Sequence, residues 1–335
     1  MKKLGVDTVS NQNLSIFISG ATGSLGKTLL KKVIDDPRYS RVIVFSRDEL
    51  KQHVIRIKSE YQSDKIRWFI GDIRDADRLK FALRGVDEVI HAAALKQVDT
   101  GEYNPMEFVK TNVIGTQNLI DASLFSGVSK FLGISTDKAS SPINLYGATK
   151  LTSDKLIIAA NNYAASFGTR LSVVRYGNVI QSRGSVVPVF QERVKNNLSI
   201  RITDKRMTRF WISLHEASNF VLNSLELMKG EELYIPKMPS IRITDLATAI
   251  SESAVIEEVG IRPGEKIHEE LISIEDGRQT FTIDKGRLAI LPSGHIDSKN
   301  FNKVSQAEFN YRSDKNDKFL TVEEIRTLIK QTQKV

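Results

Sequence analysis

The chain has no cysteine among its 335 residues. This absence excludes disulfide bonds, thiolate metal ligands and a cysteine nucleophile, and it fits a reducing cytoplasm. The sequence also lacks any apolar run approaching the roughly eighteen residues that a membrane-spanning helix needs. Residues 1–13 contain no apolar stretch long enough for a signal peptide. We therefore expect a soluble, cytoplasmic protein with no membrane partner.

Runs of like charge are missing as well. The formal net charge is +8, yet Lys and Arg are scattered, with no run of five or more like charges. Nucleic-acid binding normally relies on clustered cations, so we expect no nucleic-acid partner, and a mild positive balance suits an anionic small substrate. We also expect no metal ion. Hydrophobic residues make up 41% of the chain, which predicts an ordinary packed core.

Short apolar or β-branched runs alternate with helix-compatible stretches through the first half of the chain. The expected strands are Leu14–Ser19, Arg41–Ser46, Ile66–Ile70, Glu88–His91, Lys130–Ser135 and Leu171–Arg175. The expected helices are Leu25–Ile34, Asp75–Leu83, Val113–Phe125 and Leu145–Phe167. Such alternation predicts βαβ units and a parallel sheet that is covered on both faces. The expected fold class is therefore α/β, a Rossmann-type doubly wound parallel sheet.

A glycine turn joins the first expected strand to the first expected helix. The glycines Gly20, Gly23 and Gly26 follow the strand directly in the spacing G-x-x-G-x-x-G. Gly20 permits a tight turn, Gly23 lets backbone N–H groups approach a pyrophosphate, and Gly26 allows close helix–strand packing. The helix N-terminus adds the positive end of its dipole. We predict dinucleotide contacts at Gly20, Thr22, Gly23, Ser24, Leu25 and Gly26, the alternative being a merely flexible loop.

The end of the second strand distinguishes between the two nicotinamide cofactors. An acidic residue there suits the ribose 2′-hydroxyl of NAD, whereas Arg suits the 2′-phosphate of NADP. Ser46 and Arg47 occupy this position, so we predict NADP as the cofactor. Asp48 follows immediately and could compete, and Arg47 could instead be a solvated strand-end charge.

The strand–helix alternation is lost after Gly177, where shorter elements and turn signals follow. We therefore predict an NADP-binding Rossmann domain over residues 1–180, with a return of the chain to the sheet within 211–236. Residues 181–335 are predicted to form a smaller C-terminal substrate-binding domain.

A catalytic set is indicated after the fifth expected strand. Thr136 ends that strand, and Tyr146 and Lys150 lie four residues apart, on one face of the following helix. A free Tyr has a pKa near ~10, and a nearby cation lowers that pKa, which makes the phenol usable as a proton acceptor. Thr136 could hold the substrate oxygen, and Lys150 could reach the nicotinamide ribose. The alternative is a surface Tyr–Lys pair.

Asp137 and Lys138 stand directly beside this set. Hydride transfer alone needs only Thr136, Tyr146 and Lys150. An additional carboxyl group and amine supply an acid and a base for a second proton transfer, such as loss of water across C5 and C6 of a 4-keto sugar. The alternative is an exposed loop pair without a chemical role.

The glycine spacing resembles the short-chain dehydrogenase/reductase family, and further stretches resemble one branch of it. They are Asp72–Asp75, His91–Lys96, Ser135–Ala139, Asn144–Lys150, Arg175–Val179, Arg183–Pro188, Met207–Trp211 and Gly260–Lys266. Together they are similar to the inverting UDP-N-acetylglucosamine 4,6-dehydratases over roughly residues 14 to 270. The tail beyond Tyr311 departs from that family's pattern, which is Asn-rich and ends in Trp-Leu.

The resemblance implies an NADP-dependent, redox-neutral dehydration of UDP-N-acetylglucosamine. Tyr146 would accept the 4-hydroxyl proton, Lys138 would remove the C5 proton, and Asp137 would assist loss of the 6-hydroxyl. Further cofactor contacts are implied at Asp72, Ile73, Ala92, Ala93, Ala94, Lys96 and Val179. Substrate contacts are implied at Lys96, Asn178, Arg209, Arg262 and Glu265, and a guanidinium fork suits the two phosphates. The product would enter the pseudaminic acid pathway, and the enzyme would be a homo-oligomer.

Stereochemistry also follows from the resemblance. Retaining relatives carry a membrane-spanning N-terminus and have Met where this chain has Tyr146, so the inverting branch is favoured. Two alternatives of the same fold stay open: another UDP-sugar dehydratase or epimerase, and a non-catalytic NADP-sensing protein. Proteins of the second kind typically lose the Tyr or the Lys of the active pair, and this chain keeps both.

Overall fold

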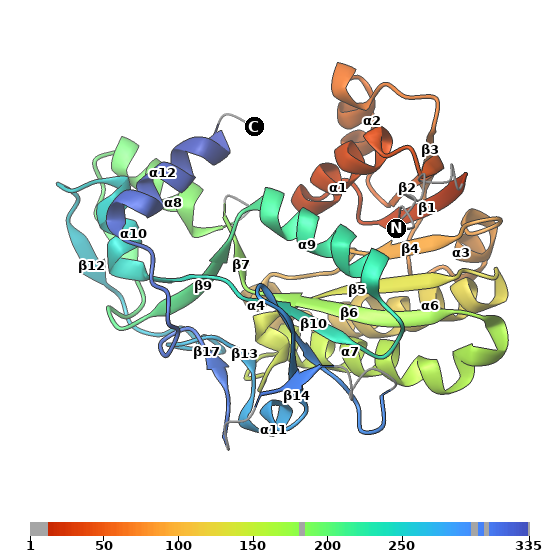
Figure 1. Cartoon of the computed structure of the whole chain (residues 1–335). Coiled ribbons are helices and arrows are strands. Elements are labelled where there is room, and N and C mark those ends of the chain that lie inside the picture. Colours follow the sequence, from red (N-terminus) through yellow and green to blue (C-terminus); the bar gives the residue numbers. More distant parts are fainter. Residues whose placement is uncertain (1–12, 181–184, 296–300, 305–307, 334–335) are drawn as a thin grey trace, which may run out of the picture.

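The computed structural model describes residues 13–180, 185–295, 301–304 and 308–333. The motif Arg183–Pro188 therefore begins outside the described residues. A large sheet with helices on both faces occupies one side of the molecule, and a smaller lobe lies on the other (Figure 1). The expected α/β fold class is confirmed.

In the part of the chain that the structure describes, ten strands form the large sheet, in the order β16-β14-β15-β10-β6-β5-β4-β1-β2-β3. Neighbouring strands from β3 through to β10 in this order run parallel. Their bounds are β1 (Leu14–Ser19), β2 (Tyr39–Ser46), β3 (Ile66–Ile70), β4 (Glu88–His91), β5 (Lys130–Thr136), β6 (Arg170–Tyr176) and β10 (Leu233–Pro236). The direction of winding reverses between β1 and β4, where doubly wound sheets open a crevice for ligands at the carboxyl ends of the strands.

The six strands expected in the first half of the chain are all present, within one or two residues at their ends. Their apolar character follows from burial on both sides: Phe17 in β1, Val44 in β2 and Leu132 in β5 are each 0% exposed. Such strands lack the alternation of a half-exposed sheet. β10 lies within the interval 211–236 and pairs with β6.

Helices cover both faces of the sheet (Figure 1). α1 packs beside α9 on one face, and α3, α6 and α7 pack together on the other. The helix bounds are α1 (Ser24–Asp35), α2 (Glu49–Arg56), α3 (Ala76–Ala82), α4 (Val98–Tyr103), α5 (Pro105–Phe108), α6 (Gly115–Phe125), α7 (Leu145–Ala164) and α9 (Leu214–Leu227). Shorter helical turns are Ser59–Tyr61, Val109–Ile114, Asp137–Ala139 and Ala165–Phe167.

Three strands that were not predicted from the sequence extend the sheet beyond β10. β15 (Arg287–Ile290) pairs antiparallel with β10, β14 (Thr280–Asp284) pairs antiparallel with β15, and β16 (Asn302–Lys303) follows. Each strand is short and carries polar residues, so no long apolar run marks it. Part of the chain after residue 180 therefore belongs to the large sheet.

The smaller lobe has a hydrophobic cluster of its own. It includes Phe190, Trp211, Leu246 and Ile325, which are all nearly inaccessible to solvent. The helices are α8 (Val186–Lys195), α10 (Ile243–Ile250) and α12 (Val322–Gln333), and α11 (Ile274–Gly277) lies near the sheet. The described strands outside the large sheet are β7 (Asn178–Val179), β8 (Ile200–Ile202), β9 (Thr208–Ile212), β11 (Ser240–Arg242), β12 (Ile256–Glu258), β13 (Glu270–Ile272) and β17 (Tyr311–Arg312).

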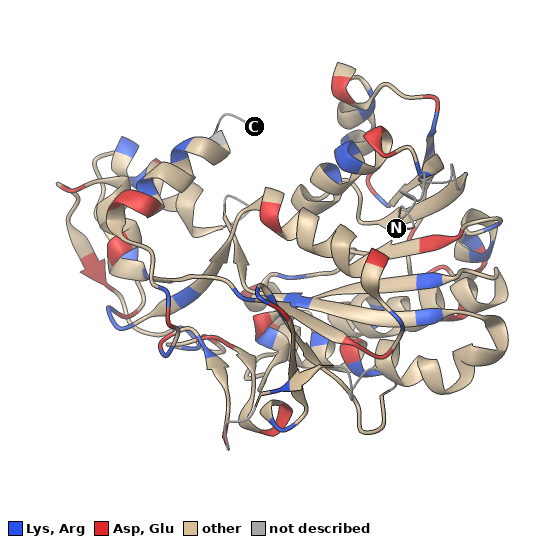
Figure 2. Ribbon diagram, viewed as in Figure 1, with Lys and Arg blue, Asp and Glu red and all other residues tan. Residues whose placement is uncertain are grey.

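Charged residues are distributed along most elements, with Lys and Arg interspersed among Asp and Glu (Figure 2). Among the described helices, none combines the length and apolar character needed to cross a bilayer. Within the same described ranges, no group of three or more His, Cys, Asp or Glu residues is arranged to hold a metal ion.

Candidate active site

A cavity of about 1010 Å³ opens at the carboxyl ends of β1, β2, β4 and β5, where the sheet meets the smaller lobe. Its lining includes every site residue predicted from the sequence except Asp72. The Asp72 carboxylate instead contacts Arg74 Nη2 at 2.8 Å and Arg47 Nη1 at 3.5 Å. Asp72 is thus paired with two guanidinium groups and does not line the cavity, so the structure does not support its predicted contact with the cofactor.

The glycine turn fits a dinucleotide. Gly20 has φ +69°, and a Cβ there would lie 2.7 Å from the backbone N of Ala93. A Cβ on Gly26 would lie 2.5 Å from the Cα of Ala21, so a helix this close to its strand requires glycine. Gly23 differs, because its Cβ would meet only the Gly20 carbonyl oxygen, at 3.2 Å. α1 begins after Gly23 without a side-chain cap, which leaves room for an anion at its N-terminus.

The end of β2 places a guanidinium group at the rim of this turn. The Arg47 side chain is 50% exposed. The neighbouring Asp48 is the N-cap of α2: its carboxylate accepts a hydrogen bond from the backbone N–H of Lys51 at 2.9 Å and pairs with Lys51 Nζ at 2.6 Å. The carboxylate that could compete for a ribose hydroxyl is therefore engaged in capping the helix.

His91 ends β4 and supports the turn from below. Its Nδ1 lies 2.8 Å from Ser19 Oγ, and its Nε2 lies 2.9 Å from Thr116 Oγ1. Ser19 Oγ in turn accepts hydrogen bonds from the backbone N–H groups of Ala92 and Ala93. Burial and the charge of Lys150 lower the pKa of His91 to about 3. The imidazole is therefore a neutral structural link.

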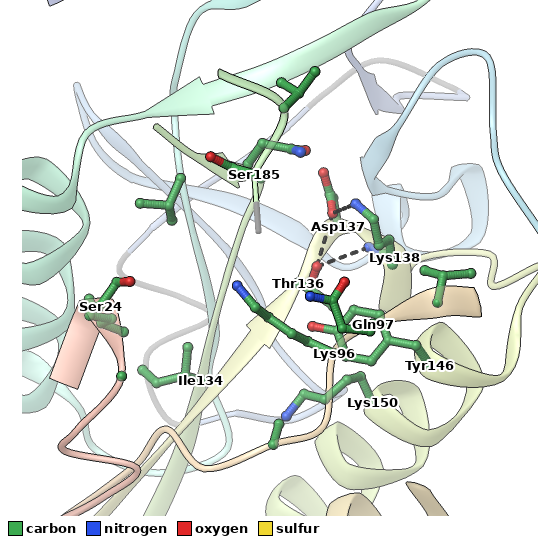
Figure 3. A pocket seen from close by; sticks show the side chains of 18 of the residues that line it. Ser24, Lys96, Gln97, Ile134, Thr136, Asp137, Lys138, Tyr146, Lys150 and Ser185 are labelled. Carbon is green, nitrogen blue, oxygen red and sulfur yellow. Dashed lines mark hydrogen bonds and ion pairs between the residues drawn. The ribbon is translucent and has the colours of Figure 1, made fainter. Parts of the chain in front are cut away.

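Thr136, Tyr146 and Lys150 gather in one part of the cavity (Figure 3). Asn144 caps α7 by accepting from the backbone N–H of Gly147 at 2.8 Å, so Tyr146 lies in the first turn of that helix. Burial raises the pKa of Tyr146 to about 12, against the lowering effects of the Lys138 charge and a hydrogen bond with Thr136. The Lys138 charge therefore lowers the pKa of the phenol, an effect for which the sequence pattern indicates Lys150.

Asp137 and Lys138 both face the cavity rather than solvent. Asp137 is 0% exposed, and its Oδ1 lies 3.0 Å from Lys138 Nζ and accepts a hydrogen bond from Thr136 Oγ1 at 3.0 Å. Asp137 Oδ2 is buried and has no hydrogen-bond partner among the described residues. The alternative of an exposed loop pair is therefore not what the structure shows.

A further acid, Glu269, meets the same ammonium group. Its Oε1 lies 3.4 Å from Lys138 Nζ and 3.8 Å from Arg209 Nε, and its side chain is only 3% exposed. Glu269 was not predicted from the sequence. It lies more than a hundred residues from Asp137 and Lys138, in a His-Glu-Glu stretch that carries no recognisable spacing.

The predicted substrate contacts line the lobe side of the cavity. Arg209 donates from Nη1 and Nη2 to the carbonyl oxygens of Ile267 and Lys266, each at 2.9 Å. Arg262 lies at the exposed rim and pairs with Glu265, with Nε 3.1 Å from Oε2. The buried Oδ1 of Asn178 has no partner in the described part of the chain, as expected for an atom that a polar ligand would contact.

Comparison with known proteins places this geometry in a family. The family model described as polysaccharide biosynthesis protein matches residues 16–289. The chain is 47% identical over 330 residues to the inverting UDP-N-acetylglucosamine 4,6-dehydratase of Campylobacter jejuni subsp. jejuni serotype O:23/36 (strain 81-176), covering 95% of this chain and 98% of the relative. The chain belongs to the polysaccharide biosynthesis protein family. Its resemblance to the inverting dehydratases is confirmed, and it is an enzyme of the lyase class.

Two further matches have other names. A UDP-glucose 4-epimerase of Rickettsia akari (strain Hartford) is 41% identical over 271 residues, covering 78% of each chain. The X-ray structure of Pen from Bacillus thuringiensis has a TM-score of 0.87 at 37% identity and covers 96% of this chain and 99% of its own. The overall fold is thus shared across nearly the whole chain.

A buried arginine, Arg175, contacts both the helix that carries Tyr146 and the segment that carries Glu269. Arg175, at 2% exposure, donates from Nη2 to Asp154 Oδ2 on α7 at 3.2 Å and from Nη1 to the carbonyl oxygen of Leu271 at 3.1 Å. Ser135 Oγ donates to the same Asp154 oxygen at 2.7 Å. Asp154 also opposes the lowering of the Lys150 pKa by burial. One guanidinium group therefore links the catalytic helix to the segment that carries Glu269.

Proposed function

We propose that the protein is an NADP-dependent, C5-inverting UDP-N-acetylglucosamine 4,6-dehydratase. The observation that supports this most directly is the burial of Asp137 and Lys138 beside Thr136 and Tyr146, in the same cavity as the glycine turn. The product would be UDP-2-acetamido-2,6-dideoxy-β-L-arabino-hex-4-ulose, a precursor for pseudaminic acid and surface glycans. We also infer that the working enzyme is a homo-oligomer.

The first chemical step is oxidation at C4 of the sugar. A bound nicotinamide cofactor supplies the hydride acceptor for C4 and later the hydride donor for C6. Tyr146 takes the proton of the 4-hydroxyl group, and Thr136 holds that oxygen through its own hydroxyl group. The pKa of Tyr146, about 12 in the unliganded site, must fall for this transfer, and the Lys138 charge and the Thr136 hydrogen bond already act in that direction.

The second step is loss of water across C5 and C6. The Lys138 ammonium group first gives a proton to Asp137, 3.0 Å away. The new 4-keto group acidifies the C5–H, and the resulting Lys138 amine removes this proton. Asp137 gives its proton to the departing 6-hydroxyl group, so water leaves with that proton and the C5–C6 double bond forms. Hydride addition to C6 leaves an enolate, which takes a proton from solvent at C5 on the opposite face, and this inverts that centre. The overall reaction consumes no external oxidant or reductant.

The cofactor and substrate would occupy opposite parts of the cavity. Arg47 would contact the 2′-phosphate of NADP, which the engagement of Asp48 as a helix cap supports. The smaller lobe would be the substrate-binding domain, with Arg209 and Arg262 near the diphosphate. Since Arg209 already donates to backbone carbonyl oxygens, it would contribute mainly its charge.

Proton NMR of UDP-N-acetylglucosamine incubated with the purified enzyme tests the proposal. We expect a new C6 methyl doublet without added reductant, with solvent deuterium at C5 and retention of the hydrogen transferred from C4 to C6. Formation of UDP-N-acetylgalactosamine alone would instead indicate a 4-epimerase, a function that the 41% identical Rickettsia relative carries in its name. An epimerase has no use for the buried Asp137–Lys138 pair, which is why we place it second.

A further inference from the structure

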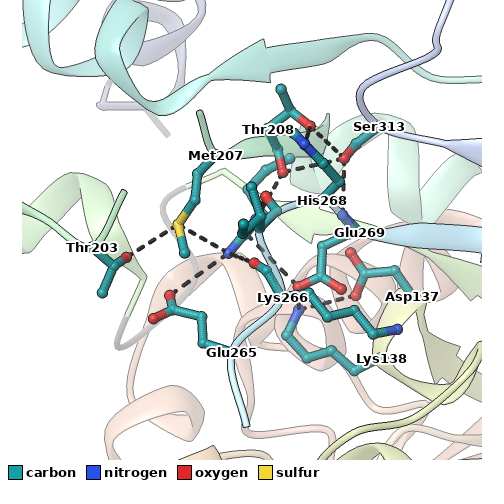
Figure 4. Close-up of polar contacts among 12 residues, drawn as sticks. Asp137, Lys138, Thr203, Met207, Thr208, Glu265, Lys266, His268, Glu269 and Ser313 are labelled. Atoms are coloured by element: carbon teal, nitrogen blue, oxygen red, sulfur yellow. Dashed lines mark hydrogen bonds and ion pairs between the residues drawn. The ribbon is translucent and has the colours of Figure 1, made fainter. Parts of the chain in front are cut away.

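The Lys138 ammonium group is shared between two buried carboxylates. Figure 4 shows the side chains of Asp137 and Glu269 both directed toward the end of Lys138. The two distances to Nζ are 3.0 Å from Asp137 Oδ1 and 3.4 Å from Glu269 Oε1. Each carboxylate also has a second oxygen, Asp137 Oδ2 and Glu269 Oε2, that is buried without a hydrogen-bond partner in the described ranges. The arrangement therefore places one amine group between two carboxyl groups.

The position of Glu269 is fixed by groups outside the catalytic set. Its backbone N–H donates to Ser313 Oγ at 2.9 Å, and its carbonyl oxygen accepts from the Ser313 backbone N–H at 2.9 Å. Ser313 is 0% exposed and donates to the Thr208 carbonyl oxygen. Arg209 lies on the other side of the carboxylate. Glu269 is thus anchored between β9 and the C-terminal tail.

We propose that Glu269 is a positioning residue for the elimination step: its ionised carboxylate holds the Lys138 amine jointly with Asp137 and keeps the transferable proton of the acid pair on Asp137. The inference rests on the proposed dehydratase function. No role in binding substrate is needed for it, because Glu269 acts through its two neighbours.

The charges around the pair favour this division of roles. Burial raises the pKa of Glu269, but the charges of Lys138, Arg209 and Lys266 outweigh it, so the net pKa is lowered. Burial raises the pKa of Asp137, Lys138 opposes the rise, and the charge of Glu269 adds to it, with a net increase. Two nearby carboxyl groups whose pKa values are driven apart become one acid and one anion.

The same two carboxylates also act on the pKa of Lys138. Burial lowers the pKa of its ammonium group, the charges of Asp137 and Glu269 raise it, Arg209 lowers it, and the net change is upward. Tyr146 and Lys96 also lie within its electrostatic reach. Removal of the Glu269 charge should therefore lower the pKa values of the catalytic acid and the catalytic base together.

The test compares kcat as a function of pH for the wild-type enzyme and Glu269→Gln. We expect the whole bell-shaped profile to move to lower pH by about one unit or more. We also expect kcat at the optimum to fall by about tenfold or more, with KM nearly unchanged. Reduced cofactor, seen at 340 nm in a single turnover, should still form, because C4 oxidation does not need Glu269.

Two further variants make the result decisive. Glu270→Gln makes the same chemical change one residue along, where the side chain contacts Ser141 Oγ instead, and its profile should match the wild type. Glu269→Asp keeps the charge but moves it away from Lys138, so its profile should shift in the same direction by less. If the Gln variant does not fold, the Asp variant decides alone.

A Glu269→Gln profile that coincides with the wild-type profile in position would overturn the proposal, even if activity were lower, because a purely structural role would lower activity without a shift. An unshifted profile of Glu269→Asp would overturn it equally where that variant decides alone. A wild-type enzyme that makes no 6-deoxy-4-keto product would instead overturn the proposed function. The two failures are therefore distinguishable.

Discussion

The two sides of the cavity are built on different principles. On the proposed cofactor side, Gly20, Gly23 and Gly26 matter because they have no side chain, which leaves space for a dinucleotide close to the backbone N–H groups. On the catalytic side, Lys138 and Glu269 matter for the charge they carry. The glycine turn lies within one continuous strand–turn–helix, whereas Lys138 and Glu269 come from segments far apart in the chain.

This difference has a chemical consequence. A dinucleotide that is regenerated in every turnover needs a binding site of fixed shape, and the space around the backbone can define such a site. Dehydration requires proton positions to change during the reaction, and a cluster of coupled ionisable groups can provide that change. Variants that act on one side only should therefore separate binding from chemistry.

The largest expected effect is on the catalytic side. Lys138→Ala removes the proposed base, so product formation should fall by about 10²- to 10⁴-fold, while the bound nicotinamide cofactor should be retained. The measurement is product quantification by NMR together with cofactor released from the denatured protein. Normal turnover by this variant would show that another group removes the C5 proton.

On the cofactor side, Gly26→Ala and Gly23→Ala should behave differently. The Cβ at position 26 would lie 2.5 Å from backbone atoms, so that variant should lose about 1–3 kcal/mol of unfolding free energy. Gly23→Ala should unfold nearly as the wild type but bind NADP about tenfold or more weakly, equivalent to about 1.4 kcal/mol. Denaturant unfolding and cofactor titration check both, and equal destabilisation of the two would contradict the assigned roles.

Arg47→Ala tests the choice of cofactor. Loss of a charged hydrogen bond to the 2′-phosphate costs about 1.5–3 kcal/mol, so NADP affinity should fall about ten- to a hundredfold and NAD affinity should stay the same. Isothermal titration with both dinucleotides measures this. Lys80→Ala, a surface cation paired with Asp77, is the matched control. Equal losses for NADP and NAD would remove the basis for the NADP prediction.

The smallest expected effect concerns His91, which is neutral in the folded protein because its pKa is lowered to about 3. The unfolded chain binds a proton there below a pH of about 6.5, so stability falls as the pH drops from about 6.5 toward 3. From pH 7 to 5 the loss should be on the order of 1–2 kcal/mol. Urea unfolding of wild type and His91→Gln at both pH values measures it, and the variant should lose less.

The sequence predicted site residues that lie within one segment better than contacts between distant segments. The turn at Gly20–Gly26 and the pair Tyr146 and Lys150 lie within single segments, where spacing alone places side chains. Glu269 was missed because its proximity to Lys138 depends on the return of the chain after residue 260. The contact with the C-terminal tail was missed as well, because nothing in the sequence marks Ser313 as a buried partner of Glu269. Strands β14 to β16 were not predicted because none of them contains a long apolar run.

The single guanidinium group of Arg175 has a mechanical implication. It joins α7, which carries Tyr146, to β13, which follows Glu269, and both contacts are buried. Both supports are therefore held by the same buried side chain. In the proposed dehydratase, this bridge would hold the oxidising and dehydrating groups at a fixed spacing while the reaction passes from C4 to C5 and C6.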